Sequence, residues 1–354
     1  MLWRSRIRKA IAQAAERDLI LVVGGLLLLF LVANSVTLGW PPAKWDVMLI
    51  SGWAIFLVGL TLVQSVPARL EGTIDRLIRR SVVQGTKSAN DVKICVHRTA
   101  SKWGCVGASI VATAMLIAFL IAFLGALSFD RVFLMIAEAL GGAVAGFYLG
   151  RMCAFGFLAQ LLQKLGASIR PVPGHVDGAG GLKPIGDFYF FQALVVSLPA
   201  AYLATWLLLL PVFDRYAYWR TPYQGLFFLA IVLEIGAFIL PMWRFHCVML
   251  EEKTALMGQA DKLAKEITEI DRSLEVCNES GALKTLTDRR AALSRQYDAL
   301  ENMPVWPVDA HTRRVFTANN AVLTLPLVFD IAGMHSVAWV KDLAGVAQTA
   351  LGIK

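Results

Sequence analysis

The chain is poor in charged residues and lacks recognisable catalytic motifs. Charged residues make up 17% of its 354 residues, against about 25% in typical soluble domains. The G-x-S-x-G, H-E-x-x-H and G-x-x-x-x-G-K-[ST] patterns are all absent. The sequence therefore offers no nucleophile elbow, zinc-protease helix or P-loop. We expect a protein that is not an enzyme and has no cofactor.

Cysteine and histidine are also scarce, with five residues of each. The cysteines form no C-x-x-C pair, and an odd, unpatterned set is typical of reduced thiols rather than of a disulfide framework. The histidines have no histidine partner four residues away on a helix face. We expect no metal site.

What the chain has instead is long apolar runs, with 57% hydrophobic residues and a mean hydropathy of +0.59. A helix that crosses the hydrocarbon core needs about 20 mostly apolar residues. The pattern predicts an all-α polytopic membrane protein with about six spans in a transmembrane domain over residues 1–246. These spans are Leu19–Leu38, Val47–Val66, Trp103–Leu127, Val132–Gly150, Phe188–Val212 and Leu226–His246.

The distribution of basic residues predicts the orientation of the spans. Of 34 lysines and arginines, 30 lie in residues 1–18, 67–102, 151–187 and 244–354. Cytoplasmic loops carry such an excess. We expect both termini in the cytoplasm and residues 305–354 to be cytoplasmic or interfacial. The apolar stretch Ala321–Val340 contains Pro326 and Asp330, and the sequence leaves open whether it enters the membrane.

The cytoplasmic loop 67–102 combines apolar residues at helical spacing with a cluster of arginines. This pattern predicts an amphipathic helix on the membrane face, with anionic lipid as its default partner. A cytoplasmic nucleotide or nucleic acid is the alternative, because clustered arginines neutralise phosphate. The candidate anion ligands here are Arg76, Arg79 and Arg80.

A glycine-rich loop occupies residues 166–187. Its exposed backbone amides offer a cradle for an anion, with Lys183 as the counter-charge, whereas His175 and Asp177 are the residues that a metal would use. The simpler interpretation is a tight loop whose glycines supply positive φ angles. The candidate ligand residues are His175, Asp177, Gly180, Gly181 and Lys183.

Residues 247–304 repeat apolar positions at heptad spacing in two stretches. The first seam is interrupted at 277–282 by Asn, Gly and Ser, which favour turns. We predict a cytoplasmic antiparallel coiled-coil hairpin that serves packing, assembly or binding of a protein partner. The two seams are Leu256, Ala260, Leu263, Ile267, Ile270 and Leu274, then Leu283, Leu286, Arg290, Leu293, Tyr297 and Leu300.

Two kinds of residue stand out inside the spans. Glu138 and Glu234 are acids at bilayer depth, where they usually face a bundle interior or a water path. They are candidates for an ion path, with a structural hydrogen-bonded carboxyl as the alternative. Gly142, Gly146 and Gly150 form a repeated G-x-x-x-G face, which predicts close helix contact within one subunit or between subunits.

Two motifs resemble those of an uncharacterised family of bacterial multi-pass inner-membrane proteins. Residues 174–186 are similar to its H-P-D-x-x-G-G-L-x-x-x-G loop, although Val176 replaces the proline. Residues 303–312 are similar to its W-P-x-D-x-x-T element, which also follows a coiled hairpin. The resemblance covers about residues 170–320 and implies this architecture and a bacterial inner membrane. The general build is also similar to the channel-like effector of Hailong-type anti-phage systems.

These features predict a homo-oligomeric ion channel or pore-forming effector that is controlled from the cytoplasmic side, with a possible place in anti-phage defence. A membrane-anchored scaffold or sensor that binds a partner through its hairpin is the alternative. A small-solute transporter is a third hypothesis, but the sequence lacks the internal repeat typical of that class.

Overall fold

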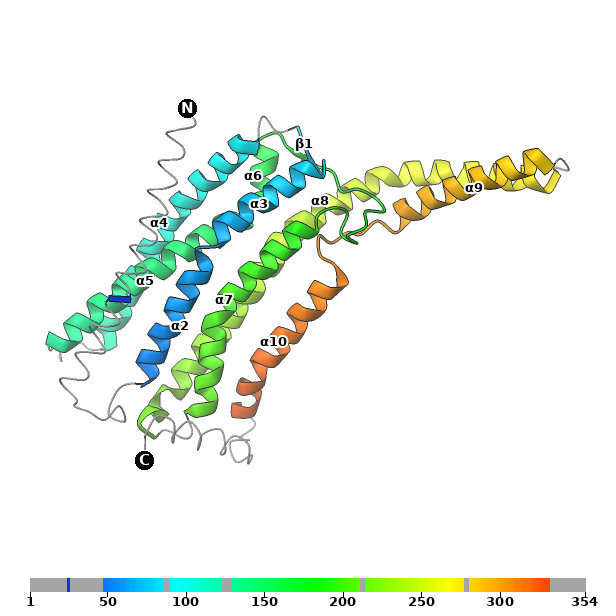
Figure 1. The fold of residues 1–354 in the computed structure, drawn as a ribbon. Coiled ribbons are helices and arrows are strands. Elements are labelled where there is room, and N and C mark those ends of the chain that lie inside the picture. The colour runs from blue at the N-terminus through cyan, green and yellow to red at the C-terminus, as the bar shows by residue number, and fades with distance from the viewer. Residues whose placement is uncertain are drawn as a thin grey trace.

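The computed structural model describes residues 24–25, 47–85, 89–122, 129–210, 214–276 and 280–331. The regular secondary structure of this part is helical apart from one two-stranded ribbon, in which β1 (Val83–Gln84) pairs antiparallel with β2 (Ser168–Ile169). The helices form an elongated bundle from which two helices project to one side (Figure 1). The predicted all-α class is confirmed.

Four of the described helices are long and apolar enough to cross a membrane. They lie in Val47–Arg79, Ala89–Ile121, Lys183–Leu209 and Tyr216–Val276, and a fifth span results if two helices joined at a 56° bend are counted together. The chain is therefore a membrane protein with at least four candidate spans. The first predicted span lies outside the described residues except for 24–25, so the number six stays a prediction.

The helices of the bundle match the other predicted spans, with different ends. Several of these helices begin or end well beyond the apolar run, because helical hydrogen bonding continues into the polar flanks. The helices that cover predicted spans include α2 (Val47–Val63), α4 (Ala89–Ala122), α5 (Phe129–Gly156) and α7 (Lys183–Leu209). Two shorter helices follow α2 and α5, namely α3 (Val66–Arg79) and α6 (Leu158–Lys164).

The predicted amphipathic helix is present as α3, but its apolar face is covered by protein. Leu70, Ile74 and Leu77 are each at most 2% exposed, and α3 packs against α7 and α4. These side chains belong to a buried core cluster shared with α6 and α7. Protein thus covers the apolar face of α3, and the placement of this helix on the membrane face with anionic lipid as its partner stays a prediction.

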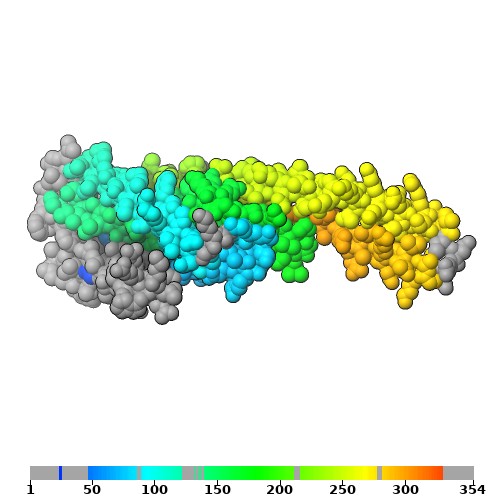
Figure 2. Space-filling model, turned by 90° about the horizontal axis from the view of Figure 1, so that it is seen from above, coloured from blue at the N-terminus to red at the C-terminus, as the bar shows by residue number. Residues whose placement is uncertain are grey.

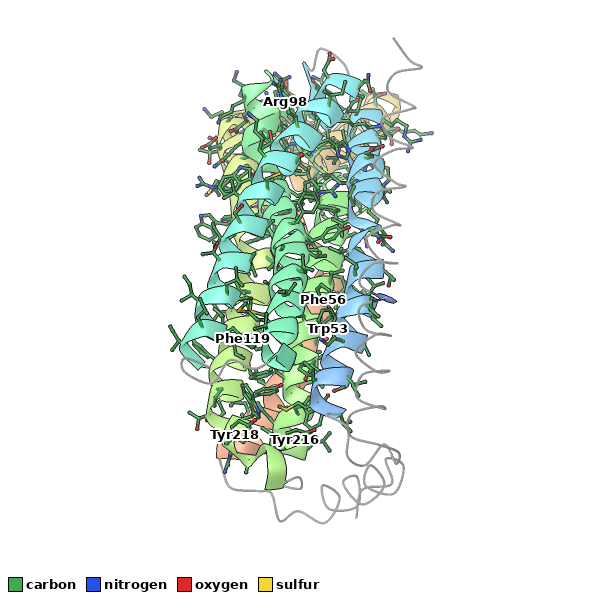
Figure 3. All side chains as sticks on the ribbon, turned by 90° about the vertical axis from the view of Figure 1, so that its left-hand side faces the viewer. Trp53, Phe56, Arg98, Phe119, Tyr216 and Tyr218 are labelled. Atoms are coloured by element: carbon green, nitrogen blue, oxygen red, sulfur yellow. The ribbon has the colours of Figure 1, made fainter. Side chains whose placement is uncertain are left out.

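The two ends of the bundle differ in character. In Figure 3 the tyrosines of the 3-10 helix η2 (Asp214–Trp219) lie at one end and Arg98 at the other. Tyr216 belongs to a second core cluster, with Met48, Leu207 and Phe227. An aromatic end opposite a basic end is the arrangement that the positive-inside rule and interfacial aromatic belts predict.

Helix α8 (Arg220–Val276) runs without a break from the aromatic end of the bundle into the projection. At 57 residues it is about 85 Å long, nearly three times the thickness of a bilayer core. Helix α9 (Ser280–Glu301) returns beside its far half, and Figure 2 shows the pair extending away from the bundle. Ala260 and Ile270 of the predicted seam are buried there, and Arg290 forms an ion pair with Asp271 across the two helices.

Helix α10 (Ala310–Ile331) packs back along α7. Its Leu323 and Leu327 contact the core cluster at the aromatic end. The cytoplasmic or interfacial placement of residues 305–354 stays a prediction, and residues 332–354 lie outside the described residues.

Candidate functional site

The most unusual polar group in the bundle is Glu234 on α8. Its side chain is fully buried. Arg220 and His246, near the two ends of the apolar part of this helix, lie about 18–21 Å away along its axis. Glu234 therefore lies near the middle of the span, where a charged carboxylate is costly and functional roles are common.

Two neighbouring asparagines of α10 bind this carboxyl group. Asn319 Nδ2 donates to Glu234 Oε1 at 3.1 Å, and Asn320 Nδ2 donates to the same oxygen at 3.4 Å. Asn320 Nδ2 also donates to the carbonyl of Phe316 at 3.1 Å. The other oxygen, Glu234 Oε2, and Asn320 Oδ1 are buried without a hydrogen-bond partner among the described residues.

Apolar and aromatic side chains enclose this polar group. Phe238, one turn from Glu234 on α8, stacks on Phe316 of α10 with ring centroids 4.2 Å apart. Ile231 and Phe238 are each less than 9% exposed. The seam between α8 and α10 is therefore a polar cluster within an apolar bundle.

The second predicted acid, Glu138, lies on α5, and its side chain lies outside the described residues. Glu234 and Glu138 are thus not shown to share a path. Asn319 and Asn320, which do contact Glu234, are absent from the sequence prediction, although an Asn-Asn pair inside an apolar helix is a visible signal.

The three predicted packing glycines lie against α4 of the same chain. A Cβ added to Gly146 would lie 2.3 Å from the carbonyl oxygen of Gly107, and one added to Gly150 would lie 2.1 Å from that of Trp103. A Cβ on Gly142 would meet Met115 Cγ at 2.9 Å. The glycines therefore allow two helix backbones to touch, and this contact lies within one subunit.

In the glycine-rich loop, the internal carboxylate of Asp177 occupies the expected anion cradle. Asp177 Oδ1 accepts the amides of Gly181 at 2.9 Å and Ala179 at 3.1 Å. The His175 ring lies 2.8 Å from the same oxygen, and Arg80 binds Oδ2 at 2.8 Å. Burial raises the pKa of this carboxyl, but the hydrogen bonds from Gly181, Ala179 and His175 outweigh burial and hold it below the ordinary value.

The backbone of this loop requires its glycines. Gly180 and Gly181 have φ angles of +62° and +83°, which side chains rarely tolerate. A Cβ on Gly181 would also lie 2.6 Å from Val82. The amides of the loop and the Arg80 side chain already bind the Asp177 carboxylate. The loop therefore joins α3 to α7 and does not present these groups as free donors.

The other predicted anion ligands are dispersed. Lys183 pairs with Asp309, and Arg76 donates to the carbonyl of Gly72, one turn earlier on α3, at 3.2 Å. Arg79 is exposed at the end of α3. The structure therefore gathers Arg80, His175 and Gly181 of the predicted ligands around the carboxylate of Asp177.

The W-P-x-D-x-x-T element forms a junction between the projection and the bundle. Asp309 pairs with Lys183 of α7 and accepts the amide of Thr312 at 2.8 Å, which caps the start of α10. The hydrogen bonds from Lys183 and Thr312 lower the pKa of Asp309. The Trp306 ring stacks on His246 of α8 at 4.3 Å. Sequence reasoning had found the motif but not these contacts.

A groove of about 500 Å³ lies at the base of the projection, beside the glycine-rich loop. It is lined by Pro173 and by residues of both α8 and α9, including Lys262, Glu266 and Gln296. No cluster of three or more His, Cys, Asp or Glu side chains suited to a metal occurs within the described ranges. No protein family, curated protein or solved structure matches the chain.

Proposed function

We propose that this protein conducts cations across a membrane and that its cytoplasmic projection controls the conduction. The observation that supports this function is the buried carboxyl of Glu234 in the middle of a candidate span, one oxygen of which has no hydrogen-bond partner among the described residues. Acidic residues at such positions mark cation pathways and proton relays. Glu234 is the residue that we assign to this path.

The continuity of α8 supports control from the cytoplasmic side. The same helix carries Glu234, the junction residue His246 and the first half of the projection. A displacement of the projection would therefore move α8 at the junction, where His246 contacts Trp306 and Val305. If the junction has two states, the hydrogen bonds between Glu234 and α10 would differ between them. A two-state element of this kind couples distant sites.

A planar-bilayer recording of the purified protein tests this function. Wild-type protein should give a cation-selective current, and Glu234→Gln should abolish most of it because the change removes the carboxyl but preserves its size. Glu269→Gln makes the same chemical change on the exposed surface of α8 and should leave the current unchanged. Equal currents from wild type and Glu234→Gln would remove Glu234 from the path.

The groove at the base of the projection favours a second candidate function, that of a membrane-anchored scaffold or sensor. A partner protein bound there would contact α8 and α9 together. Wild-type protein that gives no current in bilayers would favour the scaffold over the channel. Homo-oligomerisation, a bacterial inner membrane and a role in anti-phage defence remain predictions from the sequence.

A further inference from the structure

The hydrogen bonds around Glu234 distinguish its two oxygens. Oε1 accepts two amide N–H groups, from Asn319 and Asn320. Oε2 accepts none from the described residues. Because amide donors already serve Oε1, a proton on this carboxyl group would be held on Oε2.

The partner for such a proton is also present. Asn320 uses its Nδ2 toward Glu234 Oε1 and the Phe316 carbonyl, and its Oδ1 is buried without a partner in the described part of the chain. A carboxylic acid and a primary amide can form two hydrogen bonds at once. The amide N–H donates to the carbonyl oxygen of the acid, and the O–H of the acid donates to the oxygen of the amide. The first of these bonds is present between Asn320 and Glu234, and the two oxygens without partners are the pair that the second would join.

An ionised carboxylate would leave this arrangement unfavourable. Oε2 and Asn320 Oδ1 are both hydrogen-bond acceptors, and a buried acceptor without a donor destabilises the folded protein. One proton converts the two unsatisfied acceptors into one hydrogen bond. An alkali cation would need several oxygen ligands, whereas the buried side-chain oxygens of α8 and α10 that lack a hydrogen bond among the described residues are these two.

Other titratable groups of the surrounding helices are occupied or distant. On α7, Tyr189 and Tyr202 donate to the carbonyls of Phe155 and Met48. On α5, Arg151 lies over the rings of Phe147 and Tyr148. The charged residues and histidines of α8 nearest to Glu234 on either side are Arg220, Arg244 and His246, ten or more residues away. Those of α10 before Asn319 are His311, Arg313 and Arg314, five or more residues from it. The side chains of Glu138 and Asp330 lie outside the described residues.

We propose that Glu234 is a proton-binding site, in which Oε2 holds the proton and donates it to Asn320 Oδ1 across the seam between α8 and α10. The proton is then the cation that passes through the protein, a conclusion that rests on the proposed conduction. The binding site itself does not depend on that conduction.

Infrared spectroscopy of the purified protein in lipid tests the site directly. At neutral pH, wild type should show the carbonyl band of a protonated carboxylic acid, shifted in D2O, and Glu234→Gln should lose it. Glu269→Gln should retain the band. A spectrum without this band, or one with the same band in Glu234→Gln, would overturn the proposal.

A comparison of sodium and choline salts distinguishes a proton from an alkali cation. At constant pH the Glu234 band should be equally strong in sodium and choline chloride. Loss of the band in sodium alone would show that an alkali cation takes the site and would overturn the proposal. If the band is present but the protein gives no bilayer current, the proton site stands and the proposed conduction fails.

Discussion

The bundle contains two helix contacts that are built in opposite ways, a close backbone contact between α4 and α5 and a side-chain contact between α8 and α10. Between α4 and α5 the backbones meet through glycines, and Gly146 and Gly107 each lie against the other's carbonyl. Between α8 and α10 the contact includes a carboxyl and two amides, from Glu234, Asn319 and Asn320.

The difference separates a fixed contact from one that can change state. The glycine seam depends on shape alone, so neither a proton nor a ligand alters it. The polar seam changes its hydrogen bonds whenever Glu234 gains or loses a proton. Within one membrane domain, a rigid helix pair thus lies beside a pair whose stability depends on its chemical state.

The largest loss of stability should result from adding a side chain to a glycine between α4 and α5. Gly146→Ala places a Cβ 2.3 Å from the carbonyl oxygen of Gly107, so α4 and α5 must separate. We expect this to lower the free energy of unfolding by about 3 kcal/mol. Thermal unfolding in detergent measures this loss. Gly156→Ala on the same helix is the control, because its Cβ would meet Pro241 Cγ at an ordinary 3.5 Å. Equal melting temperatures of the two variants would contradict close contact at Gly146.

The polar seam should respond to the kind of substitution rather than to its size. Glu234→Leu leaves the amides of Asn319 and Asn320 without their acceptor, and we expect a loss of about 1–2 kcal/mol. Glu234→Gln should be nearly neutral, because its new amide donates to Asn320 Oδ1 as the proposed proton does. Thermal unfolding of both variants measures the difference, and a Gln variant as unstable as the Leu variant would favour an ionised Glu234.

The junction between bundle and projection should show a pH dependence. Asp309→Ala removes the cap of α10, which costs about 0.5–2 kcal/mol. Because the pKa of Asp309 is lowered in the folded protein, its contribution is complete above the unfolded pKa of about 3.9 and is lost as the pH falls through the folded pKa. The gap in melting temperature between wild type and Asp309→Ala should therefore narrow in strong acid. A gap that widens in acid would contradict the lowered pKa.

The smallest effect should come from the glycine-rich loop. Asp177→Asn keeps an oxygen for the amides of Ala179 and Gly181 but weakens the pairing with Arg80. We expect a loss below about 1 kcal/mol, as for exposed ion pairs. Asp75→Asn, which breaks the exposed pair with Lys93, is the matched control. A larger effect of Asp75→Asn in chemical unfolding would show that Asp177 does not organise the loop.

Much of the helical framework could be predicted from local sequence. Apolar runs indicated the helices of the described spans, and heptad spacing indicated α8 and α9 beyond the membrane. Helix ends were less accurate, because α4 begins at Ala89 in a polar segment that hydropathy does not distinguish from a loop. The G-x-x-x-G pattern predicted close contact but could not identify α4 as the partner.

Only one residue of the candidate site, Glu234, could be predicted from the sequence. A lone acid in an apolar run singled out Glu234, because the cost of burying a charge makes such residues rare. Its asparagine partners are 85 and 86 residues away, and sequence spacing gives no sign of such contacts. For the glycine-rich loop the sequence left both an anion cradle and a tight loop as interpretations, and the structure has the tight loop, in which Asp177 accepts the amides of Ala179 and Gly181.

The sequence by itself determined that the chain is helical and enters a membrane, since hydropathy and periodicity are local properties that every helix must satisfy. Only the tertiary structure decided which polar groups meet. Asp177 closes its own loop, Asp309 joins α10 to α7, and Asn320 reaches Glu234 because α10 packs back along α7 into the bundle. That return follows from long-range packing, and it gives the buried carboxyl a partner that can share its proton.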